Sequence, residues 1–301
     1  MELRHIRYFL AVAEEGNFTR AAEKLGIAQP PLSQQIRDLE REIGVQLFHR
    51  VPHGAELTSA GQAFMERVIV LPGVAREAAE AARRAARGET GTLNLGFTGA
   101  SLLNPTVSRL IRTFRRDRPD VSFKLEEGNS VELRDDLLNG TLDIAILRPN
   151  HDDPKTIVTY PLSSETLIAA IPTSRDPEPG SDEIDLLKLR DEPLVLTPRH
   201  IGLSLHDSAI AACRRAGFEP ILGQPAPQIT SIMSMVSAEQ GISLVPECMR
   251  QLALDNVSYK HLKKLPMKAT IATAILRGNP SPTAAAFIAL ARSIHREDKN
   301  R

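Results

Sequence analysis

The side chains with the clearest capacity for chemistry lie on one face of a predicted helix that starts near two prolines. Pro30, Gln34 and Arg37 recur at helical spacing on that face, and Ser33 lies on its flank. Gln can pair with adenine through two hydrogen bonds, Arg can reach guanine or a phosphate, and Ser can donate or accept. This face could therefore contact the edges of DNA bases. Because any amphipathic helix has a polar outer face, a purely structural helix remains the alternative.

A second group of polar residues occupies three loops that follow predicted strands in the last two-thirds of the chain. Ligands of α/β domains bind beyond the carboxyl ends of strands, near helix N-termini whose free N–H groups suit anions. Arg199 would add a positive charge that favours a carboxylate, and Arg148 is a weaker candidate. For each residue, a helix cap or an exposed loop side chain is the alternative. The candidates are Thr98 and Ser101, Asn129 and Ser130, and Arg199 and His200.

The chain contains no motif for catalysis or for a cofactor. There is no GxGxxG after a strand, no GxxxxGK[ST] and no HExxH. Ser204, His206 and Asp207 are nearly adjacent, which is typical of a helix start and not of a triad assembled from separate segments. Cys213 and Cys248 have apolar neighbours, so we expect buried structural thiols and not a redox sensor. The sequence therefore predicts neither an enzyme nor a protein that needs a metal or a cofactor.

The composition is that of an ordinary globular chain of two or three domains. The chain has 301 residues, of which 42% are apolar and 25% are charged. No apolar run reaches the roughly 18 residues that span a bilayer, and no secretion signal is visible, so we expect a cytoplasmic protein without membrane contact. Lys and Arg together number 37, as do Asp and Glu. Residues 1–60 carry 7 Lys/Arg against 8 Asp/Glu, a net charge of −1 that counts against DNA binding.

Short helices position the first polar face. Apolar residues at helical spacing predict a helix that ends near Gly16, and a second helix is expected over residues 18–25. Gly26 permits a sharp turn before the third helix, so the pattern is that of a helix-turn-helix. Arg50 and His53 follow after a short loop, where they could act as a wing on the DNA backbone. The inner stripe of the third helix is Leu32, Ile36, Leu39 and Ile43.

An Ala- and Arg-rich stretch over residues 58–88 predicts one long helix with a heptad seam. A helix of about 30 residues would be about 45 Å long, longer than a small domain can cover. Pairing with a second chain is therefore favoured over packing on its own domain. Pro72 removes the hydrogen bond to the carbonyl of Val68 and should kink or break the rod. The seam consists of Phe64, Val68, Leu71, Ala75, Ala78, Ala82 and Ala85.

After Gly91 the pattern changes to apolar strands that alternate with amphipathic helices. Strand–helix–strand–helix–strand over residues 93–147 predicts a parallel α/β sheet. Continuous apolar strands covered on both faces suit two doubly wound lobes. Further strands are expected at 167–171, 194–196, 242–245 and 270–276, and further helices near 208–216, 229–238 and 282–296.

Two motifs of the N-terminal segment identify a family resemblance: FTRAAEKLGIAQPPLSQQIRDLEREIGVQLFHR and, after it, ELTSAG. They resemble the N-terminal domain of LysR-type transcriptional regulators, and looser similarity continues through GFTG, FRRDRPD, GTLDIAIL and EQGISLVP. The resemblance implies an α/β protein with an N-terminal all-α winged helix-turn-helix domain (1–57) and a long linker helix (58–88). An effector-binding domain (90–301) would have two doubly wound lobes like periplasmic binding proteins. These lobes would comprise about 90–161 with 270–301, and 162–269.

The resemblance also implies partners and site residues. Family members dimerise through the linker helix, so we expect a homodimer or homotetramer that binds double-stranded DNA and a small-molecule effector, with RNA polymerase as a further candidate partner. His53 stands where the family often has Arg, which weakens one phosphate contact near neutral pH. The effector pocket would include Thr230 beside the three loops. The rival is a solute-binding or enzymatic α/β protein whose first 60 residues bind another protein. The implied DNA contacts are Gln29, Pro30, Ser33, Gln34, Arg37, Arg50 and His53.

Overall fold

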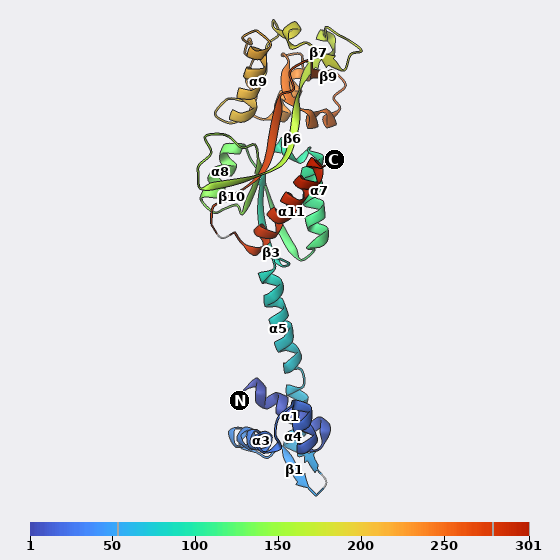
Figure 1. Cartoon of the computed structure of the whole chain (residues 1–301), viewed down its shortest axis with the longest axis vertical. Coiled ribbons are helices and arrows are strands. Elements are labelled where there is room, and N and C mark those ends of the chain that lie inside the picture. The colour runs from blue at the N-terminus through green and yellow to red at the C-terminus, as the bar shows by residue number, and fades with distance from the viewer. Residues whose placement is uncertain (53, 279, 301) are drawn as a thin grey trace. The chain divides into compact units, whose positions relative to one another are not determined.

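The structure is a computed structural model that describes residues 1–52, 54–278 and 280–300. The chain divides into two compact units, Met1–Arg83 and Arg84–Arg301, and Figure 1 labels many of their elements. In the described ranges, none of the helices combines the length and the apolar character that a bilayer crossing needs.

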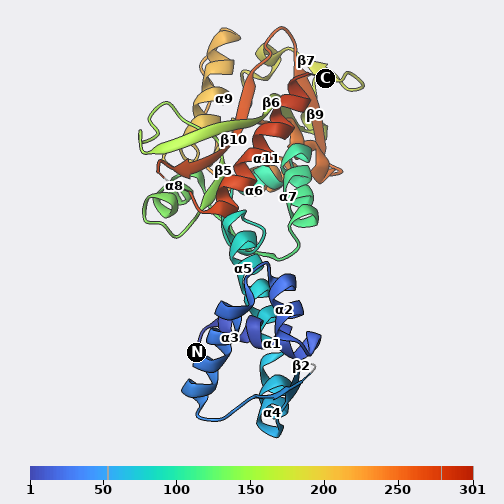
Figure 2. The same ribbon diagram turned by 60° about the horizontal axis from the view of Figure 1, so that its bottom comes forward.

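The first unit is a cluster of short helices with a two-stranded hairpin. Helices α1, α2 and α3 pack on one another, as Figure 2 shows. The two strands of the hairpin pair antiparallel, with Phe48 opposite Leu57. The elements are α1 (Leu3–Glu15), α2 (Phe18–Leu25), α3 (Gln29–Ile43), β1 (Phe48–Val51), β2 (Gly54–Leu57), α4 (Ser59–Val68) and the linker helix α5 (Leu71–Ala86).

Local signals end these helices where the sequence predicts. Gly16 and Gly26 follow α1 and α2 with φ angles of 58° and 69°, a left-handed conformation that glycine adopts without a steric penalty. Phe9 is fully buried at the centre of the unit, and its ring centroid lies 5.1 Å from that of Phe48 and 4.9 Å from that of Phe64. Leu32, Ile36 and Leu39 of α3 pack into the same core, which leaves the opposite face of α3 in solvent. The predicted stripe is wrong at Ile43, the last residue of the helix, which is 37% exposed.

The predicted single linker helix is in fact two helices. Helix α4 ends and α5 begins just before Pro72, as expected from the missing proline N–H. The seam also divides at this point. Val68 is 4% exposed, and Phe64 and Leu71 pack against the core of the first unit. The prediction of an intermolecular seam is therefore wrong at Val68, because the adjacent domain core already covers this residue. Phe64 and Leu71 are only half-buried, and helix α5 itself buries no residue.

The second unit has two lobes that share the long strand β6. In the first lobe the strand order is β4-β3-β5-β10-β6. Strand β3 pairs parallel with β4 and β5, whereas β10 pairs antiparallel with β5 and β6. Ile144 and Ile146 face the cluster that includes α7 and α11, whereas Ala145 and Leu147 face α8, so helices cover both sheet faces. The elements are β3 (Gly91–Phe97), α6 (Gly99–Leu102), α7 (Pro105–Asp117), β4 (Val121–Glu127), α8 (Ser130–Leu138), β5 (Ile144–Leu147), β6 (Ile157–Pro172), β10 (Lys268–Leu276) and α11 (Pro282–Lys299).

The second lobe is built on the last residues of β6. From Leu167 onward β6 leaves β10 and pairs antiparallel with β8 and β9, and β9 pairs parallel with the short β7. Helices α9 and α10 pack against this sheet through two separate apolar clusters. The elements are β7 (Glu183–Ile184), α9 (Leu203–Arg215), α10 (Ile229–Ser237), β8 (Ser243–Pro246), β9 (Val257–Leu262) and the 3-10 helices Thr173–Arg175, Leu186–Leu189 and Glu247–Leu252.

Strand predictions in this unit need correction in three places. The segment 194–196 forms only isolated bridges, through Leu194. Strand β6 starts at Ile157, well before the predicted 167, and Pro161 lies where its register with β10 shifts. Strand β9 was not predicted because it contains Lys260, whose buried ammonium pairs with Asp176 at 2.8 Å.

Candidate functional site

Helix α3 presents a connected polar face. Gln34 and Arg37 are exposed, and Gln34 Oε1 accepts a hydrogen bond from Arg37 Nη2 at 2.7 Å. Gln34 Nε2 donates to Asp38 Oδ1 at 2.9 Å. Pro30 is also exposed at the start of the helix. The structure thus brings these predicted side chains together on the face opposite the apolar stripe, where their donors and acceptors can reach another molecule.

Ser33 does not belong to that exposed face. Its side chain is buried, with 4% of the residue exposed, and its Oγ accepts a hydrogen bond from Gln29 Nε2 at 2.7 Å. The prediction of a direct base contact by Ser33 is therefore corrected, because the helix turns this hydroxyl toward the core. Its observed contact instead holds the amide of Gln29, which is half-buried at the first position of α3.

The hairpin β1–β2 provides the expected wing. Arg50 lies exposed on β1, and its guanidinium carbon is 5.4 Å from the ring centroid of Phe18. His53 lies outside the described residues. Several acids of this unit have internal partners: Lys24 Nζ lies 2.8 Å from Glu14 and 3.0 Å from Glu15. The negative charge of the segment is thus partly neutralised away from the exposed face of α3.

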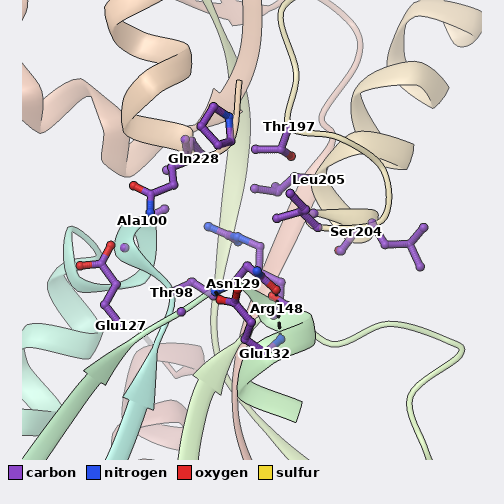
Figure 3. A pocket seen from close by; sticks show the side chains of 18 of the residues that line it. Thr98, Ala100, Glu127, Asn129, Glu132, Arg148, Thr197, Ser204, Leu205 and Gln228 are labelled. Atoms are coloured by element: carbon purple, nitrogen blue, oxygen red, sulfur yellow. Dashed lines mark hydrogen bonds between the residues drawn. The ribbon is translucent and has the colours of Figure 1, made fainter. Parts of the chain in front are cut away.

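The second unit contains a cavity of about 310 Å³ between its two lobes. Figure 3 shows residues of the first lobe, such as Thr98 and Asn129, on one side and residues of the second lobe, such as Thr197 and Gln228, on the other. The cavity is lined by Thr98, Gly99, Ala100, Glu127, Gly128, Asn129, Ser130, Glu132, Arg134, Arg148, Thr197, Ile201, Gly202, Leu203, Ser204, Leu205, Pro227, Gln228, Ile229 and Thr230.

Arg148 is the buried cation of this cavity. Only 4% of the residue is exposed, and its Nη2 donates to Glu165 Oε2 at 2.7 Å. The other oxygen of Glu165 accepts from Asn104 Nδ2 at 2.9 Å. Arg148 Nη1 is buried without a hydrogen-bond partner. Because an unpaired buried donor is costly, this nitrogen marks a position where a ligand acceptor would be stabilising.

Two helix N-termini of the second lobe also line the cavity without caps. The N-cap residues of α9 and α10 are Gly202 and Gln228, and no side chain caps the first turn of either helix. Uncapped first turns present N–H groups and the positive end of the helix dipole. Helix α8 differs, because Asn129 and Glu132 form a capping box that occupies its first N–H groups. Asn129 and Ser130 therefore line the cavity, but the Asn129 oxygen already has partners.

The structure corrects three of the predicted effector contacts. Arg199 is 62% exposed in its side chain and forms two hydrogen bonds with Asp207, at 2.8 and 2.9 Å, outside the cavity. This guanidinium lowers the pKa of Asp207. Ser101 is fully buried and donates to the Thr98 carbonyl at 2.7 Å, and His200 is exposed and does not line the cavity. Arg199 lies outside the cavity because helix α9 places Asp207, its fifth residue, within hydrogen-bond distance of Arg199.

Of the predicted effector residues, the structure brings four to the cavity: Thr98, Asn129, Ser130 and Thr230. Arg148, the weaker candidate from the sequence, lines the cavity with a positive charge in place of Arg199. Sequence reasoning missed Arg134, Glu127 and Gln228. Glu127 and Gln228 could have been found, because Glu127 lies between a predicted strand and Asn129, and Gln228 directly precedes a predicted helix.

Each of the two units matches a known protein-family model. Residues 3–62 match the family of bacterial regulatory helix-turn-helix proteins of the lysR family, and residues 86–295 match the LysR substrate binding domain. The chain belongs to the LysR family of transcriptional regulators. This family consists of DNA-binding regulators and not of enzymes, so the rival assignment as an enzyme is excluded.

Individual members of the family are similar over nearly their whole length. The chain is 37% identical to the HTH-type transcriptional regulator BudR of Raoultella terrigena, over 96% of this chain and 99% of BudR. The crystal structure of CbnR, a LysR family transcriptional regulator, superimposes with a TM-score of 0.82 at 30% identity and covers 97% of this chain and 100% of CbnR. Full-length CbnR complexed with its target DNA gives a TM-score of 0.80 at 28% identity, over 98% and 100% of the two chains.

Proposed function

We propose that this LysR regulator is controlled by a small organic anion that binds in the cavity between its two lobes. One observation supports this proposal most directly. Arg148 Nη1 has no hydrogen-bond partner, and two uncapped helix N-termini line the same cavity as Arg148. A carboxylate would accept from all three groups, and its bond to the guanidinium would be charge-assisted. A neutral ligand could occupy the space, but it would leave the donors of the two helices and the arginine without a charged acceptor.

The DNA-binding part of the proposal rests on the first unit. Residues 1–57 would bind double-stranded DNA through α3 and the wing, with Gln29, Pro30, Gln34, Arg37 and Arg50 in contact and Ser33 acting through Gln29. Residues 58–88 would dimerise the chain, and residues 90–301 would hold the effector. Two DNA-binding domains joined in a dimer can bind two half-sites that lie about one helical turn of DNA apart. RNA polymerase would be the partner through which a bound effector changes transcription.

The first test is calorimetry of the full chain with short-chain carboxylates and with the corresponding neutral amides. We expect a carboxylate to bind and its amide to bind far more weakly. In the Arg148→Gln/Glu165→Gln double variant, where two amides replace the buried ion pair, carboxylate affinity should fall by about 1.5–3 kcal/mol. Arg199→Ala is the matched control, and its affinity should be unchanged because Arg199 lies outside the cavity. A best ligand that carries no anionic group would refute the anion assignment.

The second test links the cavity to DNA. The full chain would be titrated onto a DNA fragment from the region upstream of its own coding sequence, with and without the carboxylate found by calorimetry. We expect the carboxylate to change the affinity or the length of DNA protected in the parent, and to have no effect in the Arg148→Gln/Glu165→Gln variant. Identical footprints with and without ligand in the parent would contradict control by this cavity.

A further inference from the structure

Glu127 is an unused carboxylate in the wall of the cavity. Two carboxylates line the cavity, Glu127 and Glu132. Glu132 has a structural partner, since its Oε2 accepts from the backbone N–H of Asn129 at 2.9 Å in the capping box of α8. Glu127 has neither a hydrogen bond nor an ion pair with any residue that the structure describes, and it is exposed to the cavity at the end of β4. Its acceptor capacity is therefore free for a ligand.

The fold gives this carboxylate a defined position. Gly99 allows it to approach the chain closely, because a Cβ at residue 99 would lie 2.5 Å from Glu127 Oε1. Figure 3 shows the Glu127 side chain extending toward Ala100, and Gln228 of the second lobe also lines the cavity. The amide of Gln228 also has no partner among the described residues and can donate or accept. Glu127 and Gln228 therefore both line the cavity with polar groups that have no partner among the described residues.

A free negative charge in a cavity otherwise suited to an anion must affect which anions bind. A simple carboxylate gains the donors of Arg148 and the helix N-termini but is repelled by the charge of Glu127. A ligand that also carries a hydrogen-bond donor converts this repulsion into attraction, and an ammonium group does so most strongly because it is charged. Selection of this kind is a difference between affinities, produced by an unfavourable contact with the wrong ligand.

We propose that the effector is an organic acid that also carries a hydrogen-bond donor, foremost an ammonium group as in an amino acid, and that Glu127 binds this donor. This inference rests on the proposed anion function of the same cavity and adds the chemical class of the effector. The alternative is that Glu127 is a solvated surface side chain, in which case a donor group on the ligand would give no advantage.

The experiment is competitive calorimetry of the full chain with matched acids that differ only in one substituent. Each series contains an unsubstituted acid, its hydroxy acid and its amino acid, with three to six carbons and the substituent at successive positions. The first series is propionate, lactate and alanine. In the parent, we expect the amino acid of at least one series to bind about tenfold or more tightly than the unsubstituted acid, with the hydroxy acid between them.

Two variants identify the group responsible. Glu127→Gln keeps the shape and removes the charge, so the preference for the amino acid should disappear and the unsubstituted acid should bind equally well or better. Glu126→Gln is the matched control, because it removes the same charge from the adjacent exposed residue of β4, which does not line the cavity. We expect the control to keep the parent preference.

The outcomes separate this inference from the proposed function. If unsubstituted acids bind as tightly as amino and hydroxy acids, Glu127 has no role in selection and the inference is wrong, while the anion function stands. If the preference exists but survives in Glu127→Gln, another group binds the donor, and the assignment to Glu127 is wrong. If no acid of any series binds, both the anion function and this inference are overturned.

Discussion

Arg148 and Glu165 form an ion pair with 2.7 Å between Nη2 and Oε2, and their side chains are only 4% and 6% exposed. Arg148 directly follows β5 of the first lobe, and Glu165 belongs to β6, which continues into the second lobe. The Arg148 guanidinium, whose Nη1 has no partner, is therefore bonded to β6, the strand that runs from one lobe to the other. A ligand acceptor that bonds Nη1 would act on the same guanidinium that holds β6.

We expect Glu165→Gln to destabilise the second unit by about 3–5 kcal/mol, because removal of one partner leaves a buried charge uncompensated. Urea unfolding followed by circular dichroism measures this change. Glu192→Gln is the control: Glu192 pairs with Arg175 at 3.1 Å on the surface, and its loss should change the free energy of unfolding by about 1 kcal/mol or less. Equal effects of the two substitutions would contradict the structural importance of the buried pair.

The exposed polar face of α3 predicts the effect of substitutions on DNA binding. Gln34→Ala or Arg37→Ala should weaken specific binding by about 1–3 kcal/mol if these residues contact base edges. Fluorescence anisotropy at constant salt concentration, with DNA from the upstream region, measures the affinity. Arg83→Ala removes an exposed positive charge from α5 and should have little effect. Parent-like affinity of both α3 variants would show that another surface reads the DNA.

Ser33 should act indirectly. Because its buried hydroxyl accepts from Gln29 Nε2, Ser33→Ala removes one hydrogen bond, worth about 0.5–1.5 kcal/mol. We expect Ser33→Ala and Gln29→Ala to weaken DNA binding in a non-additive way, since both substitutions release the same amide. A double-mutant cycle measured by the same anisotropy assay checks this. Additive effects would mean that Ser33 does not position Gln29.

The break between α4 and α5 changes which residues should affect dimerisation. Val74 is exposed at 54% and adjoins the exposed Ile69 and Val70, whereas Val68 is buried. Val74→Glu should lower the mass seen by sedimentation without lowering the melting temperature, because a carboxylate opposes burial in an interface. Gln62→Glu is the control, since it adds the same charge to an exposed polar position of α4. Val68→Glu should instead unfold the first unit, and unchanged mass in Val74→Glu would exclude α5 from the interface.

The buried thiol of Cys213 predicts a loss of stability at high pH. Burial raises the pKa of this thiol from 9.0 to about 11. Above pH 9 the unfolded chain would therefore lose this proton while the folded chain keeps it. The stability that the neutral thiol contributes is complete below the unfolded pKa and is lost as the pH rises through the folded value. The free energy of unfolding of the parent relative to Cys213→Ala should fall by about 1.4 kcal/mol per pH unit in this window. A difference that does not change with pH would show that the thiol titrates equally in both states.

The sequence by itself determined the N-terminal helices and the family. Helices α1 to α3 were predictable because their ends carry local signals, such as Gly16, Gly26 and the prolines at the start of α3, and local signals act through the backbone of a few residues. The break at Pro72 was predictable for the same reason. The LysR motifs then identified the order of the domains, because these motifs extend over most of the first unit and do not depend on any single contact.

Only the tertiary structure decided which polar side chains face a ligand. Arg199 and Arg148 both follow apolar segments, and nothing local distinguishes them. The pairing of Arg199 with Asp207, and the burial of Arg148 beside Glu165, depend on how α9 and β6 pack. Ser33 is likewise buried, because it lies next to the apolar stripe of α3 and the buried face of the helix is wide enough to include it. Orientation and pairing arise from contacts between segments far apart in the chain, and periodicity contains no information about them.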